Sequence, residues 1–114
     1  MEMGEQINEM TNTFPKKEVY NLSSQLRRAI DSVALNISEG AIGQSNPEQK
    51  RFMGYAIRSL AEVVTCLHKA ERRGYISKQE FETQYNNAFN LMNMMIGFKN
   101  KIKQTSVFHL RSSV

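Results

Sequence analysis

The segment from Phe14 to Gly40 constrains the fold more than any other part of the chain, because its pattern predicts a turn followed by one long amphipathic helix. Its apolar residues recur at intervals of three and four, which places them on one helical face. They are Val19, Leu22, Leu26, Ala29, Ile30, Val33 and Ile37. Gly40 is expected to end this helix, since glycine readily adopts the left-handed conformation found there. A single apolar face must be buried against other elements, so a helical bundle is expected.

The second half of the chain contains two more helices with recognisable ends. Ser45 or Asn46 is placed to cap the first of them. Ser77 and Glu80 have the spacing of a capping box, in which each side chain accepts a backbone N–H of the other residue, and this predicts the start of the last helix. Gly74 lies between the two and is expected to follow the end of the earlier helix.

A short amphipathic segment over residues 2–13 brings the expected number of helices to four. Short connections make neighbouring helices antiparallel. We therefore predict an all-α, antiparallel up-down-up-down four-helix bundle over residues 1–104, followed by a flexible C-terminal tail over residues 105–114. The first helix is short and contains Gly4, so we expect it to fray or to borrow packing from a neighbouring subunit. The predicted core comprises Leu26, Ile30, Val33, Ile37, Phe52, Ala56, Leu60, Val63, Leu67, Phe81, Tyr85, Phe89 and Met92.

The length of 114 residues suits one domain. No apolar run approaches the roughly 20 residues that a membrane span requires, so no membrane association is expected. The first ten residues lack the basic and apolar regions of a signal peptide. Cys66 is the single cysteine and has no partner for an internal disulfide, which favours a reducing, cytoplasmic location.

Carboxylates and guanidinium groups occur together around the second and third helices, and such groups can perform acid–base catalysis. A structural role is favoured here, because Glu39 and Arg51 flank a short loop and are expected to pair across it, while Asn36 satisfies loop backbone groups. The predicted structural polar network is Arg28, Asn36, Glu39, Arg51 and Glu62. The chain has no Gly-rich phosphate loop, no Ser-His-acid motif and no Cys/His cluster. We therefore expect no enzymatic activity, no cofactor and no metal.

A second apolar face on the last helix predicts self-association. Leu91, Met94 and Phe98 lie outside the main apolar stripe of that helix, and Leu35 has a similar position on the long helix. A monomer would expose these side chains, and exposed apolar patches of this kind mark protein–protein interfaces. A homo-oligomer is therefore expected, with Leu35, Leu91, Met94 and Phe98 at the interface.

The net charge of +4 is concentrated near the C-terminus, where four cations and no acid follow Glu82. Clustered cations attract nucleic-acid phosphates. The predicted nucleic-acid contacts are Arg27, Lys50, Arg58, Lys99, Lys101 and Lys103. Cations at the end of a helix also complement its dipole, and this explanation of the three lysines remains open. The alternative function is a protein–protein interaction scaffold without a nucleic-acid role.

Several ordered sequence patterns carry a family resemblance. They are QLRRA and NISEG in the long helix, Arg51-Phe52, Ala56, Ser59, Leu60 and Glu62 in the next, and Phe14-Pro15, Gly74-Tyr75 and Ser77 at the connections. This set resembles the four-helix-bundle proteins encoded by intervening sequences in bacterial 23S rRNA genes, a group that is similar to the accessory proteins of diversity-generating retroelements. The loop after Gly40 departs from the family pattern, because Ala-Ile-Gly-Gln replaces a frequent Gly-Arg pair.

The resemblance implies a four-helix bundle that assembles as a ring of five subunits. The retroelement accessory proteins work beside a reverse transcriptase and RNA, so the resemblance also makes RNA or DNA binding an expectation for this chain. The missing arginine after Gly40 weakens the expectation that this particular loop binds phosphate.

Overall fold

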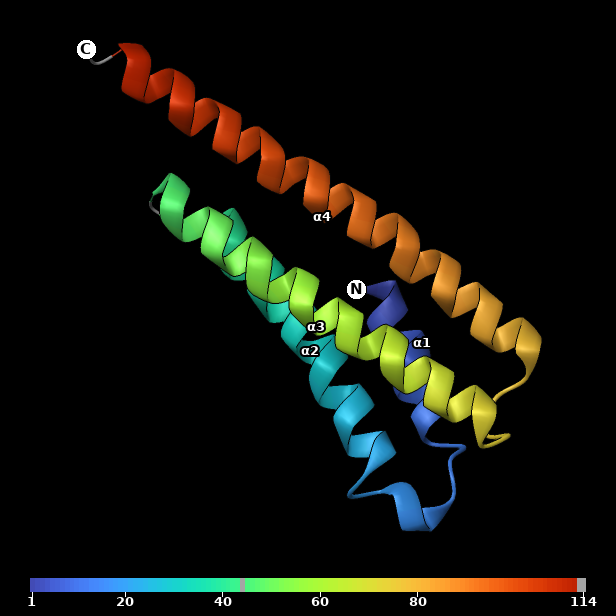
Figure 1. Ribbon diagram of the computed structural model, residues 1–114. Coiled ribbons are helices and arrows are strands. Elements are labelled where there is room, and N and C mark those ends of the chain that lie inside the picture. The colour runs from blue at the N-terminus through green and yellow to red at the C-terminus, as the bar shows by residue number, and fades with distance from the viewer. Residues whose placement is uncertain (44, 113–114) are drawn as a thin grey trace.

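The computed structural model describes residues 1–43 and 45–112, with side chains through residue 102. The chain forms α1 (Glu2–Thr11), a 3-10 turn η1 (Lys16–Glu18), α2 (Leu22–Ala41), α3 (Asn46–Arg72) and α4 (Lys78–Ser112). No strand occurs among these residues, and successive helices run in opposite directions (Figure 1). The predicted all-α four-helix fold is therefore confirmed. No helix in the described part of the chain is long and apolar enough to cross a membrane.

The α2–α3 pair forms the centre of the bundle. Both helices bury most of the apolar stripe that their spacing predicts, and Leu26, Val33, Leu60 and Val63 are completely buried. Val19, the first residue of the predicted stripe, is an exception, because it precedes α2 and is exposed. The hydroxyl groups of Ser32 and Ser59 form a 2.8 Å hydrogen bond between the two helices. Both serines are half-buried, and their hydroxyl groups satisfy each other.

Gly40 does not end α2, contrary to expectation, but lies inside it and is buried. A Cβ atom at this position would lie 2.8 Å from the Cε of Met53 and 3.5 Å from the Cβ of Phe52. Gly40 therefore leaves room for the end of the Met53 side chain against α2.

The predicted ends of α3 are confirmed. The Ser45 hydroxyl accepts a 3.2 Å hydrogen bond from the backbone N–H of Glu48 at the start of the helix. At the other end, Gly74 has a φ of +76°. The N–H of Tyr75 donates to the carbonyl of Ala70 at 2.9 Å, which is the long hydrogen bond of a Schellman motif.

The predicted capping box of α4 is also present. The backbone N–H of Ser77 donates to the Glu80 carboxylate at 3.1 Å, and the backbone N–H of Glu80 donates to the Ser77 hydroxyl at 3.0 Å. The helix extends to Ser112, so its backbone continues beyond the expected boundary at residue 105. The flexibility of residues 105–114 stays a prediction.

Helix α1 packs within its own chain rather than fraying. Ile7 is completely buried, and Met3 and Met10 are buried beside it. The side-chain amide of Gln84 in α4 donates a 2.9 Å hydrogen bond to the side-chain oxygen of Gln6. Because apolar packing and a polar contact both hold α1, its short length does not prevent it from being ordered.

The face that helix α4 presents to the core only partly matches the predicted one, because Phe81 and Met92 pack against the core but Tyr85 and Phe89 do not. Tyr85 and Phe89 belong to the predicted core but are 40% and 57% exposed, whereas Gln84, Ala88 and Met95 are buried. The remaining predicted core residues are buried or half-buried. Apolar residues surround α4, so helical periodicity alone does not select a face. Packing on α3 and on the short α1 makes that selection.

Candidate nucleic-acid interface

The outward face of α3 carries a line of exposed residues at alternating spacings of four and three. We call it the α3 stripe, and it comprises Arg51, Tyr55, Arg58, Glu62, Thr65, Lys69 and Arg72, all of which are exposed. This spacing places the residues on one side of a helix, opposite the buried stripe. Four cations against one carboxylate leave a net charge of +3.

The cations of the α3 stripe are available to a ligand. No carboxylate among the described residues lies within ion-pair distance of a stripe cation, whereas the neighbouring Arg73 pairs with Glu18. The guanidinium of Arg58 lies 6.0 Å from the ring centroid of Tyr55, and that of Arg51 lies 5.3 Å from the ring centroid of Phe52. These rings limit the positions of the guanidinium groups without neutralising their charge.

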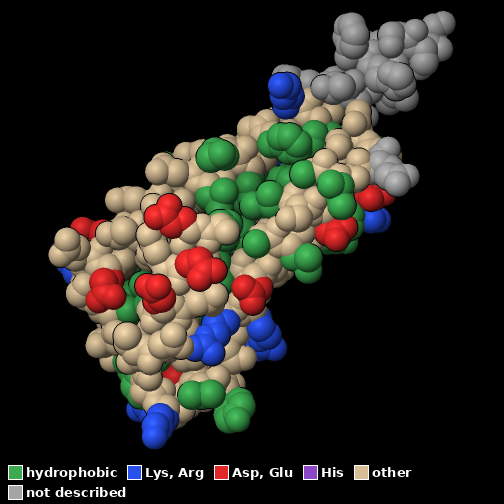
Figure 2. Space-filling model, turned by 180° about the vertical axis from the view of Figure 1, so that it is seen from behind, with side chains coloured by type: hydrophobic (Ala, Val, Ile, Leu, Met, Phe, Trp, Pro, Cys, Tyr) green, Lys and Arg blue, Asp and Glu red, His purple; other side chains and the backbone are tan. Residues whose placement is uncertain are grey.

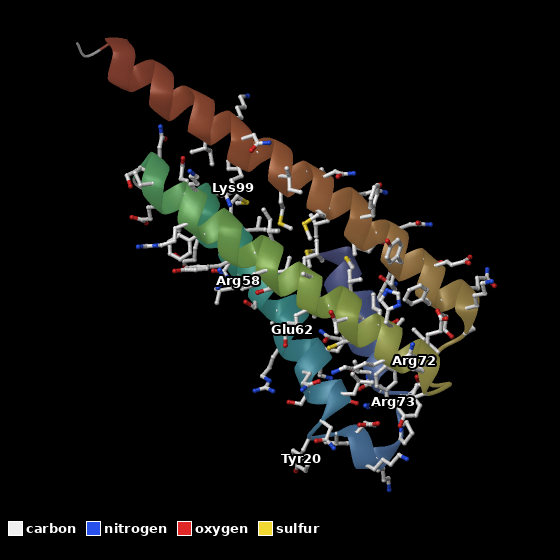
Figure 3. All side chains as sticks on the ribbon, in the orientation of Figure 1. Tyr20, Arg58, Glu62, Arg72, Arg73 and Lys99 are labelled. Carbon is white, nitrogen blue, oxygen red and sulfur yellow. The ribbon has the colours of Figure 1, made fainter. Side chains whose placement is uncertain are left out.

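The structure brings some of the predicted nucleic-acid contacts together. Arg58 belongs to the α3 stripe, and Lys50 is half-buried eight residues before it on α3. The ammonium of Lys99 lies 3.6 Å from the position that a Cβ on Gly54 would occupy, so α4 directs this cation onto α3 between Lys50 and Arg58. Figure 3 shows Lys99 and Arg58 on this upper part of the bundle.

The other predicted contacts are placed differently. Nε of Arg27 donates to the Thr11 hydroxyl at 2.7 Å and its terminal nitrogen donates to the Asn12 side chain at 2.6 Å, so this guanidinium fastens the end of α1 to α2. Lys101 is exposed on α4. The side chain of Lys103 lies outside the described part of the structure.

The predicted structural polar network is not assembled as expected. Glu39 and Arg51 are exposed and do not form the expected ion pair. The loop is bridged instead by Gln49, whose side chain donates a 3.3 Å hydrogen bond to the carbonyl of Gly43. Asn36 donates to the Ser32 carbonyl at 2.8 Å and therefore acts within α2 rather than on the loop. The remaining two members, Arg28 and Glu62, are also exposed.

A hydrogen-bonded cluster forms where η1 meets the end of α3. One carboxylate oxygen of Glu18 accepts from the Tyr75 hydroxyl at 2.6 Å and from the Arg73 guanidinium at 3.0 Å. The Tyr75 hydrogen bond, with help from the Leu22 backbone and the Arg73 charge, lowers the pKa of Glu18. The same hydrogen bond raises the pKa of Tyr75, because the donor proton is held by the carboxylate.

An open cavity of about 750 Å³ adjoins this cluster, and we call it the basal pocket. Its lining residues come from η1, the start of α2 and the end of α3: Lys17, Glu18, Asn21, Leu22, Gln25, Lys69, Arg73 and Tyr75. Lys69 belongs to both the α3 stripe and the basal pocket. Figure 3 shows Arg72 and Arg73 at this end of α3, with Tyr20 at the corner below them.

Sequence reasoning identified cations such as Arg58 as nucleic-acid contacts but did not assemble either cationic surface, for different reasons. The spacing of the α3 stripe is readable in the sequence, but prediction assigned its members to separate roles or to a structural network. The basal pocket joins Lys17 to Arg73, which are far apart in the chain, and no local motif connects them.

An apolar groove of about 230 Å³ lies between α2 and α4, and we call it the α2–α4 groove. It is lined by Ile37, Ala41, Met53, Leu91, Met94, Met95 and Phe98. Figure 2 shows hydrophobic side chains gathered in the hollow between these helices. Three of the four predicted interface residues line this groove. Leu35 is exposed, but it is two positions from Ile37 and therefore faces another side of α2.

No group of three or more potential metal ligands is found among the described residues. Cys66 is buried, and desolvation raises the pKa of its thiol, followed by the nearby Glu62 charge. Burial keeps the protonated thiol as the dominant form and makes this side chain a packing residue.

Comparison with protein-family sequence models found a match to the family described as 23S rRNA-intervening sequence protein, over residues 1–97. The match therefore includes all of α1, η1, α2 and α3 and more than half of α4. A search of curated proteins produced no match.

Proposed function

This chain belongs to the 23S rRNA-intervening sequence protein family, and we propose that it is a non-enzymatic, cytoplasmic, homo-oligomeric bundle that binds RNA or DNA through backbone phosphates. The observation that carries this proposal is the α3 stripe, whose four cations are exposed and have no carboxylate partner within the described structure. Exposed arginine and lysine side chains of this kind neutralise the phosphates of nucleic acids.

The dimensions of the α3 stripe favour several simultaneous phosphate contacts. From Arg51 to Arg72 the helix rises by about 30 Å, at ~1.5 Å per residue. Arginine binds phosphate oxygens with two parallel hydrogen bonds, so Arg51, Arg58 and Arg72 suit this role. The stripe contains one aromatic residue, Tyr55, and contacts to phosphates carry no sequence information. Binding is therefore expected to depend on salt and to vary little with sequence.

The uneven distribution of charge between α1 and α3 determines which side of the bundle a nucleic-acid strand would bind. Residues 1–15 contain three acids and no cation, and the acids Glu2, Glu5 and Glu9 are exposed on α1. Acidic side chains gather on the face seen in Figure 2, which is the back of the molecule in Figure 1. Phosphates are repelled from this face and attracted to the outward face of α3.

Self-association is the second part of the proposal. The α2–α4 groove and the exposed side chain of Met94 support an interface at this side of the bundle. Family resemblance favours a pentamer, although packing arguments alone support only an oligomer. Oligomerisation would repeat the α3 stripe and strengthen phosphate binding through multiple contacts.

The test is a titration of labelled single-stranded RNA and duplex DNA over a series of salt concentrations. The Arg51→Gln/Arg58→Gln variant should bind more weakly and lose about 0.7 to 0.9 units of salt slope for each phosphate contact removed. Lys16→Gln/Lys78→Gln is the matched control, because it removes the same charge from exposed positions outside the stripe. Equal losses in both variants, or no binding by the wild type at low salt, would refute phosphate binding by the α3 stripe.

A protein-interaction scaffold is the second candidate function. The specific observation in its favour is the α2–α4 groove, whose lining is entirely apolar. This function predicts a stable oligomer that binds neither RNA nor DNA at low salt. The same titration, combined with light scattering, separates the two functions.

A further inference from the structure

We propose that the basal pocket binds the terminal phosphomonoester of a single-stranded nucleic acid and that the adjacent unpaired base stacks on Tyr20. This inference rests on the proposed nucleic-acid binding and specifies where the end of the strand lies. A strand with a 5′-phosphate and a strand with a 3′-phosphate present the same group to the pocket, a phosphate with a single ester bond.

The charge of the basal pocket matches a phosphomonoester. Lys17, Lys69 and Arg73 contribute three positive charges and Glu18 contributes one negative charge, which leaves +2. A terminal phosphate carries about −1.5 to −2 at pH 7, whereas each phosphate within a strand carries a single negative charge. The end of a strand is therefore attracted more strongly than an internal phosphate.

The basal pocket contains one hydrogen-bond donor that is held in place, Arg73, and two that are free to move, Lys17 and Lys69. Glu18 fixes Arg73 by one guanidinium nitrogen, and the Tyr75 hydroxyl fixes Glu18 in turn. A guanidinium has five N–H donors, so Arg73 keeps donors for a ligand. The ammonium groups of Lys17 and Lys69 are exposed and have no hydrogen bond or ion pair within the described structure. They are free to close on a bound phosphate.

Tyr20 is placed to bind the base. Its side chain is 93% exposed, which is far more than an aromatic residue with a packing role would be. It directly precedes Asn21, which lines the basal pocket, and it points away from the bundle at the corner between η1 and α2 (Figure 3). Unpaired bases stack on exposed aromatic rings of this kind in proteins that bind single strands.

The position of the pocket explains how a strand would reach it. Lys69 belongs to both the α3 stripe and the basal pocket, so the two cationic surfaces are continuous. A strand whose internal phosphates contact the outward face of α3 can therefore place its terminal phosphate beside Lys17 and Arg73.

The experiment compares one short single-stranded RNA in three forms, with a 5′-phosphate, with a 3′-phosphate and with neither. The wild type should bind one phosphorylated form about tenfold more tightly than the unphosphorylated form, and the preferred form identifies the end. Lys17→Gln should reduce this preference severalfold. Lys16→Gln should retain it, because Lys16 belongs to the same turn but does not line the pocket.

Tyr20 is tested separately with two variants. Tyr20→Phe should keep the affinity for the preferred RNA, and Tyr20→Ala should lower it by about fivefold or more, as expected for the loss of one base stack. Circular dichroism should show unchanged helix content in both, since Tyr20 is exposed.

Two failures can be distinguished. Equal affinity for the three RNA forms, or equal effects of Lys16→Gln and Lys17→Gln, would overturn the terminal-phosphate site while leaving binding by the α3 stripe intact. Absence of binding to all three forms at low salt would overturn the proposed function and this inference together.

Discussion

The Tyr75 hydroxyl donates a 2.6 Å hydrogen bond to the carboxylate of Glu18, and this contact joins η1 to the α3–α4 connection. The ring of Tyr75 lies 5.4 Å from that of Phe14, centroid to centroid, so the same side chain also packs on the turn before η1. Arg73 pairs with the same oxygen of Glu18 and completes the cluster. The wall of the basal pocket is thus held by contacts between residues far apart in the chain.

This cluster predicts a pH-dependent contribution of Glu18 to stability. The folded protein lowers the pKa of Glu18 below its ordinary value of 4.5, chiefly through the Tyr75 hydrogen bond. Its contribution is therefore present above pH 4.5 and is lost as the pH falls through the lower, folded-state pKa. Glu18→Gln should have a lower melting temperature than the wild type at pH 7, and the difference should shrink as the pH falls below 4.5 and through the lowered pKa of Glu18. A difference that persists unchanged in acid would contradict this assignment.

Ile7 tests whether α1 belongs to the folded core. Ile7→Ala should reduce the free energy of unfolding by about 2–5 kcal/mol, because the side chain is completely buried. Glu5→Ala, an exposed change on the same helix, should alter it by less than about 0.5 kcal/mol. Urea denaturation measures both, and a small effect of Ile7→Ala would indicate the frayed helix that the sequence suggests.

If the α2–α4 groove is the oligomer interface, a charged residue introduced there should weaken self-association. Met94→Asp should shift the protein towards monomers, because Met94 is 71% exposed and lines the groove. Asn93→Asp places the same carboxylate one position earlier, at an exposed residue outside the groove, and should preserve the oligomer. Light scattering at micromolar protein concentration measures the mass. A monomeric wild type would refute the interface.

The lysines of α4 test whether the protein binds the backbone phosphates of nucleic acids. Replacing Lys99, Lys101 and Lys103 together with glutamine should weaken binding to different RNA and DNA sequences alike. It should also flatten the salt dependence by about one unit of slope for each phosphate contact removed. The fold should survive, because Lys99 is half-buried and Lys101 is exposed, and surface substitutions usually change the free energy of unfolding by less than about 0.5 kcal/mol. If the triple variant binds only one nucleic-acid sequence more weakly, the lysines do not act through phosphate contacts. Circular dichroism of the variant checks that its helices remain.

The local features of this bundle could be predicted from the sequence. Ser45, Ser77 and Gly74 mark helix ends through hydrogen bonds that span only a few residues, and the structure contains each of these contacts. The buried stripes of α2 and α3 could also be predicted, because each helix has one apolar face with polar residues opposite. The α3 stripe was equally readable, since its spacing is the complement of the buried one.

Other features depend on which segments meet in three dimensions. Apolar residues surround α4, so its periodicity allowed several buried faces, and contacts with α3 and α1 selected one that excludes Phe89. Gly40 could end a helix or lie within one, and the structure places it inside α2 with the end of the Met53 side chain beside it. The basal pocket requires Lys17, Lys69 and Arg73 to converge from separate elements. Hydrogen bonds at helix ends are local and are encoded by neighbouring residues, whereas helix faces and pockets follow from packing free energies between distant segments, which no local pattern specifies.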